Sequence, residues 1–236
     1  PARGIHTHNF LCPEVQALFR MSKIETINPA TGKVLATYEN INADEVSRKV
    51  KAAREAFAKW KKLDIVERAE YMRRLGRVMR KNREEYARLV TEEMGKPIRQ
   101  SLAEIEKCAW VCDYYAEHAE AFLRDEIIPT EFRKSFVSFE PLGVVACIMP
   151  WNFPFWQVMR FAVPALTAGN VGLLKHSSIC LGSAIKIEQA FMDAGFPENI
   201  FQAVVGDSRA GEALVQSNID AVSVTGSVNT GRRVAE

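Results

Sequence analysis

Apolar residues between Asn42 and Leu123 recur every three or four positions, which is the spacing of one buried helix face. The clearest stripes are Val46, Val50, Ala53, Phe57, Trp60 and, further on, Ile98, Leu102, Ile105, Ala109, Cys112, Ala116, Ala119. Capping-box spacing marks three helix starts, at Asn42 with Glu45, Asp64 with Glu67, and Asn82 with Glu85. Pro97 suits the first turn of the last helix. This part of the chain therefore predicts a helical layer.

After Phe136 the pattern changes to short apolar runs separated by helical segments. The runs predict strands at 144–149, 171–174, 201–205 and 221–224, with helices at 155–166, 180–194 and 209–216. Strands that alternate with helices indicate βαβ units and a parallel sheet. The predicted fold class is α/β, a Rossmann-like parallel sheet with an N-terminal helical layer.

Parallel sheets bind ligands at the carboxyl ends of their strands. The loops to search are therefore 150–152, 175–178, 206–208 and 225–227. The dinucleotide pattern G-x-G-x-x-G is absent, but two glycine pairs lie five residues apart, Gly206 with Gly211 and Gly226 with Gly231. Glycine at such a junction lets a phosphate approach a helix N-terminus. The alternative interpretation is that these are turn glycines.

Three polar side chains in or near these loops admit two interpretations each. Asn152, amid apolar neighbours, either caps a turn or donates to a substrate oxygen. Lys175 either bonds ribose hydroxyls or a phosphate, or is a surface lysine. Arg160 either pairs with an acidic neighbour or binds a substrate carboxylate. Ser227, just after Gly226, can add a hydroxyl donor to a phosphate.

Composition narrows the class of protein. The 236 residues are 47% hydrophobic and 25% charged, as in ordinary globular proteins. With 31 basic and 29 acidic side chains the net charge of +2 gives no electrostatic case for nucleic acid or an anionic membrane. The many Lys and Arg between residues 48 and 83 alternate with Glu and predict a solvated helix face. No apolar run reaches the roughly 20 residues of a membrane span.

Cysteine and histidine usage indicates neither a metal site nor a catalytic triad. Five cysteines at irregular spacing suggest reduced thiols and a cytoplasmic location. Cys112 and Cys147 fall on apolar positions and are predicted to be structural, as is Cys108; Cys180 is nearest to the proposed ligand loops. Residues 1–20 lack a signal-peptide layout and are treated as an extension.

Several segments together resemble the aldehyde dehydrogenase family. They are Asn-Pro-Ala-Thr-Gly at 28–32, Glu-Met-Gly-Lys-Pro at 93–97, Pro-Trp-Asn-Phe-Pro at 150–154, Lys175, and Val-Thr-Gly-Ser at 224–227 with Gly231. Within the family the chain is similar to succinate-semialdehyde dehydrogenases, which share the Leu-Leu-Lys-His run at 173–176. The resemblance implies a helical segment at 21–140 packed on a dinucleotide-binding segment at 141–236.

The resemblance also implies roles for individual residues. Asn152 would donate to the oxyanion formed during the reaction, and Arg160 would pair with a substrate carboxylate. The residues implied to contact the cofactor are Met149, Pro150 and Trp151 on the nicotinamide side, Lys175 and Ser178 at the ribose, Gly226 and Ser227 at the pyrophosphate, and Gly206 near the adenine. Ser178 stands where relatives often have a glutamate that binds ribose hydroxyls, so both NAD and NADP are admissible.

The implied function is NAD(P)-dependent oxidation of an aldehyde to a carboxylic acid, with succinate semialdehyde as the expected substrate. In the family the nucleophilic cysteine and the glutamate base follow the Thr-Gly-Ser segment. The chain as given is therefore expected to be an inactive, C-terminally truncated cofactor-binding half of a homo-oligomeric enzyme. The alternative is a non-catalytic nucleotide-binding or assembly module.

Overall fold

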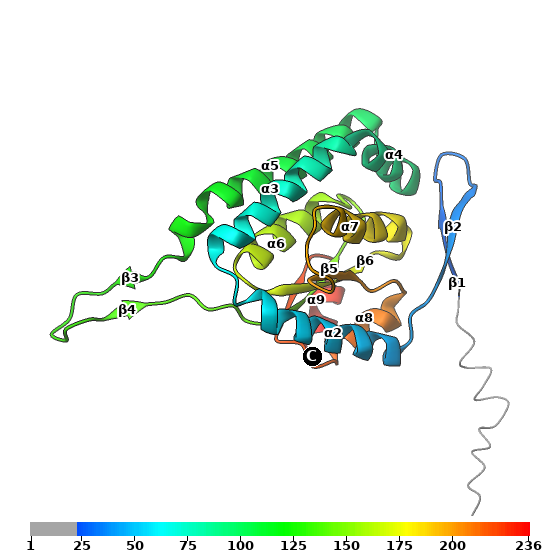
Figure 1. Cartoon of the computed structure of the whole chain (residues 1–236). Helices are drawn as coiled ribbons and strands as arrows, with labels where there is room; N and C mark the ends of the chain where they lie inside the picture. Colours follow the sequence, from blue (N-terminus) through cyan, green and yellow to red (C-terminus); the bar gives the residue numbers. More distant parts are fainter. Residues whose placement is uncertain (1–22) are drawn as a thin grey trace, which may run out of the picture.

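A four-stranded parallel sheet lies between two groups of helices (Figure 1). The computed structural model describes residues 23–236, so the predicted extension at 1–20 lies outside the described residues. The strands are β5 (Val144–Met149), β6 (Val171–His176), β7 (Phe201–Ala203) and β8 (Ala221–Val224), in the spatial order β7-β6-β5-β8. All neighbouring pairs are parallel, which confirms the α/β fold expected from the sequence.

Strand β6 is longer than predicted. It continues through Lys175 and His176, and His176 is in register with Met149 of β5. The sequence-based boundary at Leu174 was wrong because it followed the end of the apolar run, whereas both polar residues are buried and extend the ladder. Lys175 is therefore part of the strand and not of the loop that follows it.

The helices form layers on both faces of the sheet (Figure 1). On one face lie α6 (Trp156–Thr167) and α7 (Leu181–Asp193), preceded by the short helix η1 (Ser178–Cys180). These two helices are covered by α3 (Ile65–Lys81), α4 (Arg83–Met94) and α5 (Ile98–Leu123). On the opposite face lie α2 (Ala43–Trp60) and α8 (Ser208–Val215), and α9 (Val228–Ala235) follows β8. The predicted helical layer is confirmed.

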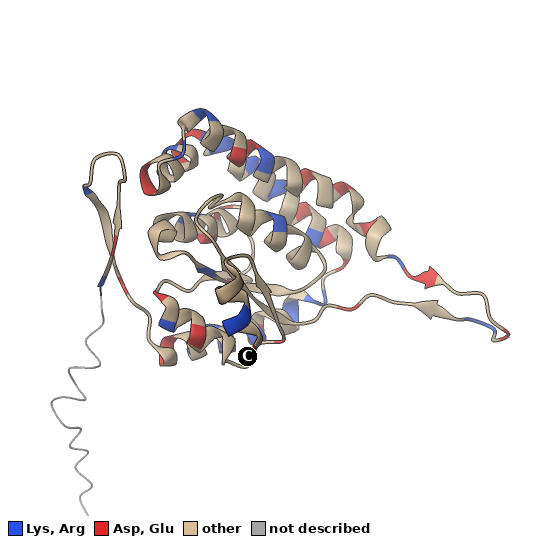
Figure 2. Cartoon of the chain, turned by 180° about the vertical axis from the view of Figure 1, so that it is seen from behind, with Lys and Arg blue, Asp and Glu red and all other residues tan. Residues whose placement is uncertain are grey.

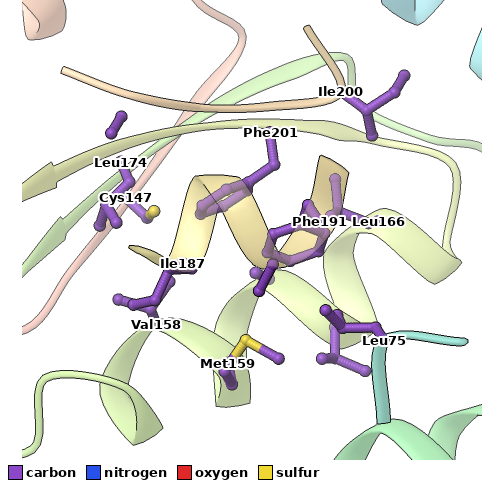
Figure 3. Close-up of a cluster of buried hydrophobic side chains, with 14 of the residues drawn as sticks. Leu75, Cys147, Val158, Met159, Leu166, Leu174, Ile187, Phe191, Ile200 and Phe201 are labelled. Carbon is purple, nitrogen blue, oxygen red and sulfur yellow. The ribbon is translucent and has the colours of Figure 1, made fainter. Parts of the chain in front are cut away.

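The hydrophobic core joins this helical layer to the sheet (Figure 3). Phe191 of α7 stacks on Phe201 of β7 with ring centroids 4.5 Å apart, and Leu75 of α3 reaches the same cluster. Each such side chain contributes about 1.5–3 kcal/mol on full burial. Cys112 and Cys147 are fully buried, as the sequence predicted.

Two of the three predicted capping boxes are present. The side chains of Asn42 and Asp64 accept from the backbone N–H of Glu45 (2.9 Å) and Glu67 (2.7 Å) at the starts of α2 and α3. The third prediction was wrong. Asn82 also ends α3, with φ −102° and ψ 16°, so its side chain cannot fold back over the start of α4 and donates to the Tyr86 hydroxyl instead.

Basic side chains on α3 lie on a mixed-charge surface, as the sequence predicted (Figure 2). Arg73, Arg74 and Arg77 all lie within 3.5 Å of Glu70 carboxylate oxygens. Arg80 pairs with Glu106 of α5 at 3.3 Å. None of the helices between residues 23 and 236 combines the length and apolar character that crossing a bilayer requires.

Two antiparallel hairpins escaped the sequence analysis. The first pairs β1 (Lys23–Ile27) with β2 (Val34–Glu39), and the second pairs β3 (Glu126–Ile127) with β4 (Phe136–Val137). The β3–β4 hairpin projects from the body of the molecule (Figure 1) and exposes large apolar side chains, including Ile127 at 67% and Phe132 at 71%. Its strands have only two residues each, too few for a recognisable alternation.

Candidate functional site

The strand order reverses between β5 and β8. From β5 the chain first continues to β6 and β7 on one side and then returns to β8 on the other. Ligands of open α/β sheets bind at such a switch point. The loop after β5 carries Asn152, and the loop after β8 carries Thr225, Gly226 and Ser227. Arg160 of α6 connects the two loops, because its guanidinium donates to Thr225 Oγ1 at 3.0 Å.

Asn152 presents its amide to solvent at this point. The residue is exposed, and the structure records no hydrogen bond of its side chain within residues 23–236. Its neighbours Trp151 and Phe153 are 51% and 44% exposed. The N-cap of α6 is Phe155. The turn-capping interpretation of Asn152 therefore has no support, and the amide is available to a ligand.

Buried polar groups hold the backbone just after Asn152. Glu104 of α5, 4% exposed, accepts from the N–H groups of Phe155 (2.9 Å) and Trp156 (3.0 Å) and so caps α6. Its second carboxylate oxygen forms a buried ion pair with Lys96. The Lys96 ammonium also lies 3.7 Å from the centroid of the Phe153 ring, a cation–π contact.

His176 holds the same segment from the sheet side. Ser177 N–H donates to His176 Nδ1 at 2.8 Å, so the proton of the neutral ring is on Nε2, which donates to Pro154 O at 2.9 Å. Burial lowers the pKa of His176 to about 4, and nearby Lys175 acts in the same direction. The ring is thus neutral at physiological pH, in the tautomer that the Pro154 carbonyl requires.

The Glu-Met-Gly-Lys-Pro segment supplies a second helix cap. Glu93 accepts from the N–H groups of Gly182 (2.7 Å) and Ser183 (2.9 Å) at the start of α7. A Cβ on Gly182 would lie 2.7 Å from Glu93 Oε1, so the contact requires glycine there. Gly95 ends α4 with φ +76°, which turns the chain toward Lys96. Together, Glu93 and Glu104 occupy the N-termini of α7 and α6.

A pocket of about 600 Å³ lies on the other side of the switch point, between α8 and α9. Its lining includes Ile148, Lys175, Gly211, Glu212, Thr230 and Arg233. Of the residues predicted to bind the cofactor, Lys175 lines this pocket, and Gly226 with Ser227 lie immediately before α9. Gly211, second in its glycine pair, faces Lys175, whose Cγ would lie 3.4 Å from an added Cβ.

Lys175 is a buried cation without an ion pair in the part of the chain that the structure describes. Its ammonium donates to His176 O at 2.6 Å. Burial lowers the pKa of Lys175 to about 8, and Asp207 opposes this shift. The interpretation as a surface lysine is wrong, because the side chain is 7% exposed. A buried amine beside a pocket suits hydroxyl or phosphate oxygens.

The two leading glycines differ in their surroundings. A Cβ on Gly206 would lie 2.5 Å from Ala210 Cβ and from Asn40 Oδ1, so packing requires this glycine. A Cβ on Gly226 would meet nothing nearer than Thr230 at 3.4 Å. Ser227 caps α9 by accepting from Thr230 N–H at 3.2 Å. The sequence-based interpretation as turn glycines thus describes Gly206 better than Gly226.

The remaining predicted contacts lie close to the switch point. Met149 is buried at the end of β5, Pro150 is half-buried and Trp151 is exposed in the following loop. Ser178 begins η1 and is half-buried. Burial raises the pKa of the Cys180 thiol, which marks a structural cysteine. Residues 23–236 contain no cluster of three metal-ligating side chains.

Sequence reasoning missed Glu104 as part of this site. It noted His176 only as a neighbour of Lys175 and quoted Glu93 and Lys96 only within a motif. One signal was available. Ser101, Glu104 and Cys108 follow each other at helical spacing beside the apolar stripe of α5, and all are buried. A carboxylate on such a face needs a partner.

Known proteins resemble this chain in sequence and in fold. The aldehyde dehydrogenase family model matches residues 19–236. The chain is 45% identical over 213 residues to a probable NADP+ succinate-semialdehyde dehydrogenase of Synechocystis sp., covering 90% of the chain and 47% of that protein. It is 42% identical to a succinate semialdehyde dehydrogenase of Escherichia coli described as using NAD(P)+, covering 89% and 46%.

A solved structure from Streptococcus pyogenes, a succinic semialdehyde dehydrogenase in complex with NADP+, matches with a TM-score of 0.85 and 30% identity over 90% of the chain and 47% of its own. The structure of PnpE with nicotinamide adenine dinucleotide matches with a TM-score of 0.86 and 32% identity, covering 91% and 45%. The chain spans about half the length of the curated relatives it matches. It belongs to the aldehyde dehydrogenase family.

Proposed function

We propose that the protein containing this chain oxidises succinate semialdehyde to succinate with NAD or NADP. The observation that carries the proposal is Asn152, an exposed amide without an internal partner, at the strand switch point and on a rigidly held loop. The names of the relatives support the substrate, since those from Synechocystis and Escherichia coli are described as succinate-semialdehyde dehydrogenases.

We assign the pocket between α8 and α9, about 600 Å³ in volume, and residues 141–236 to dinucleotide binding. The buried amine of Lys175 beside the pocket supports bonding to ribose hydroxyls, and the glycine at 226, just before α9, supports the approach of a phosphate to that helix start. Ser178 supplies no charge against a 2′-phosphate, which agrees with relatives named for NADP+ and for NAD(P)+. When bound, the cofactor accepts a hydride from the substrate.

In this proposal Asn152 donates its amide N–H to the oxygen that becomes negative when a nucleophile attacks the aldehyde carbon. Met149, Pro150 and Trp151 border the nicotinamide side. Arg160 binds the substrate carboxylate; in the structure its guanidinium contacts only the neutral hydroxyl of Thr225 among recorded partners in 23–236, so its charge is available. The resemblance implies that a cysteine nucleophile and a glutamate base act with Asn152 in this family.

The test is Asn152→Ala in the full-length protein. Loss of one oxyanion donor is expected to lower kcat by about 10²–10³-fold with NADP+ affinity retained. Gln189→Ala, which removes an exposed amide on α7, serves as the control and should leave kcat unchanged. Cofactor binding without any aldehyde oxidation by the wild-type protein would instead favour the non-catalytic nucleotide-binding module.

The substrate is tested with Arg160→Ala. The variant should raise KM for succinate semialdehyde much more than KM for butyraldehyde, which has the same chain length without the carboxylate. Equal increases in KM for the two aldehydes would show that Arg160 does not bind the substrate carboxylate.

We also propose that the full-length protein is a cytoplasmic homo-oligomer. The exposed apolar side chains of the β3–β4 hairpin support self-association, because large apolar patches mark interaction surfaces. The four cysteines among residues 23–236 are free thiols, which supports a reducing compartment. Sedimentation of the full-length protein tests the oligomeric state.

A further inference from the structure

Four consecutive residues after Asn152 are held by side chains from distant parts of the chain. Lys96 contacts the Phe153 ring, His176 binds the Pro154 carbonyl, and Glu104 binds the N–H groups of Phe155 and Trp156. The three holding residues are buried, with exposures of 6%, 1% and 4% for Lys96, His176 and Glu104. We call them the loop clamp.

The loop clamp contacts residues 153–156, and Asn152, the proposed oxyanion donor, immediately precedes them. Asn152 and Trp151 are exposed, and no side chain of the described residues is recorded as bonded to the Asn152 amide. The position of that amide is therefore set by the backbone on which it stands. This backbone enters from β5, where Ser177 N–H donates to Met149 O at 3.0 Å, and leaves through Pro154, where His176 donates.

We infer that His176 is a positioning residue for the oxyanion donor, acting through the Pro154 carbonyl and supported by Glu104 and Lys96. The inference rests on the proposed function of Asn152. An amide that is to stabilise a developing charge must be fixed before the reaction. A displacement of about 1 Å at a reacting centre can lower the rate by 10²-fold.

The geometry of the imidazole allows a matched pair of variants. In His176→Asn the amide oxygen takes the place of Nδ1 and can still accept from Ser177 N–H, but nothing reaches Pro154 O. In His176→Gln the amide nitrogen takes the place of Nε2 and can still donate to Pro154 O. The two variants thus separate the bond from His176 to Pro154 O from the bond that His176 accepts from Ser177 N–H, a donor that Met149 O also accepts from.

The experiment uses the full-length enzyme with NADP+ and succinate semialdehyde. His176→Asn is expected to lower kcat by about 10- to 100-fold, while the dissociation constant for NADP+ stays as in the wild type. His176→Gln should recover most of the lost kcat. If His176→Asn does not fold, His176→Leu takes its place with the same expected loss.

A control distinguishes positioning from general destabilisation. Thr167→Val removes another buried hydrogen bond of α6, in which Thr167 Oγ1 donates to Val163 O at 2.7 Å, far along the helix from Asn152. It should lower Tm about as much as His176→Asn but leave kcat unchanged. Parallel losses of kcat in both variants would overturn the inference.

A double variant tests whether His176 acts through Asn152. In the Asn152→Ala background, His176→Asn should cause no further loss of kcat, because the group it positions is gone. If the two substitutions lowered kcat by factors that multiply in the double variant, the inference would be overturned while the proposed function stayed intact. If Asn152→Ala itself left kcat unchanged, the proposed function would fail instead.

Discussion

The helices after β5 and β6 and those after β7 and β8 begin differently. The N-termini of α6 and α7 are occupied by Glu104 and Glu93, buried carboxylates from the helical layer. Those of α8 and α9 are capped by their own residues, Asp207 and Ser227, and these helices border the 600 Å³ pocket. A helix N-terminus attracts anions.

The difference supports one place in the fold as the proposed site of a ligand anion. The first pair of helices is already neutralised by carboxylates within the protein, so a phosphate gains nothing there. In the second pair, the start of α8 holds the Asp207 carboxylate, which pairs with Arg209, whereas the start of α9 holds only the neutral hydroxyl of Ser227. The cationic amine of Lys175 has no acidic partner at bonding distance in the described residues. In the proposed function, the occupied side is a fixed platform for Asn152, and the open side is the ligand site.

The largest expected effect is on the occupied side. Glu104→Gln leaves Lys96 as an uncompensated buried charge and should lower the free energy of unfolding by about 3–5 kcal/mol. Glu212→Gln on the open side breaks an exposed pair with Arg233 and should cost at most about 1 kcal/mol. Urea unfolding measures both, and equal costs would erase the distinction between the two sides.

His176 adds a pH dependence to the occupied side. Its pKa is about 4 in the folded protein and near 6.5 when unfolded, so the unfolded state binds more protons between these values. The free energy of unfolding is therefore at its full value, as far as His176 is concerned, above pH 6.5. It decreases as the pH falls to 4, by roughly 3 kcal/mol in all. Unfolding of the wild type and His176→Gln as a function of pH measures it; parallel profiles would contradict the assignment.

On the open side Lys175 is expected to destabilise the ligand-free protein. Its pKa is about 8 folded and 10.5 unfolded, so the penalty is complete below pH 8 and disappears as the pH rises to 10.5. Lys175→Met should raise the free energy of unfolding at pH 7 by about 1–2 kcal/mol and weaken NADP+ binding. A less stable variant would show that the amine serves packing and not the ligand.

The smallest effect on stability is expected at Gly226. Alanine fits there, so Gly226→Ala should change the free energy of unfolding by less than about 0.5 kcal/mol yet weaken NADP+ binding. Gly206→Ala is the comparison, because its Cβ collides with Ala210 and should lower stability. Unchanged NADP+ affinity in Gly226→Ala would show that this glycine takes no part in cofactor binding.

The sequence predicted the fold well where periodicity reports burial. The strand at 144–149 and the stripe of α2 match the structure because apolar residues there face the core. The strand at 221–224 also forms, although its residues are only half-buried or exposed. It failed at Lys175 and His176, where polar residues continue a buried strand, and at Asn82, whose backbone conformation depends on the preceding helix.

For the candidate site, local patterns selected the groups that are proposed to face a ligand but not the residues that hold those groups in place. Asn152 could be selected because its loop follows a predicted strand. Glu104 lies 48 positions earlier in the chain, and its bond to Phe155 N–H follows only from the packing of α5 on α6. Such long-range pairing leaves no trace in local periodicity.

The hydrogen bond between Arg160 and Thr225 joins the proposed substrate site to the proposed cofactor site. If a substrate carboxylate engages the Nη2 nitrogen that donates to Thr225 Oγ1, Arg160 releases the hydroxyl that adjoins Gly226 and Ser227. The binding of the substrate and the binding of the cofactor are then thermodynamically linked. If one ligand changes the affinity of the other by some factor, the second changes the affinity of the first by the same factor. Through this one arginine, occupancy of either site would change the affinity of the other site for its ligand.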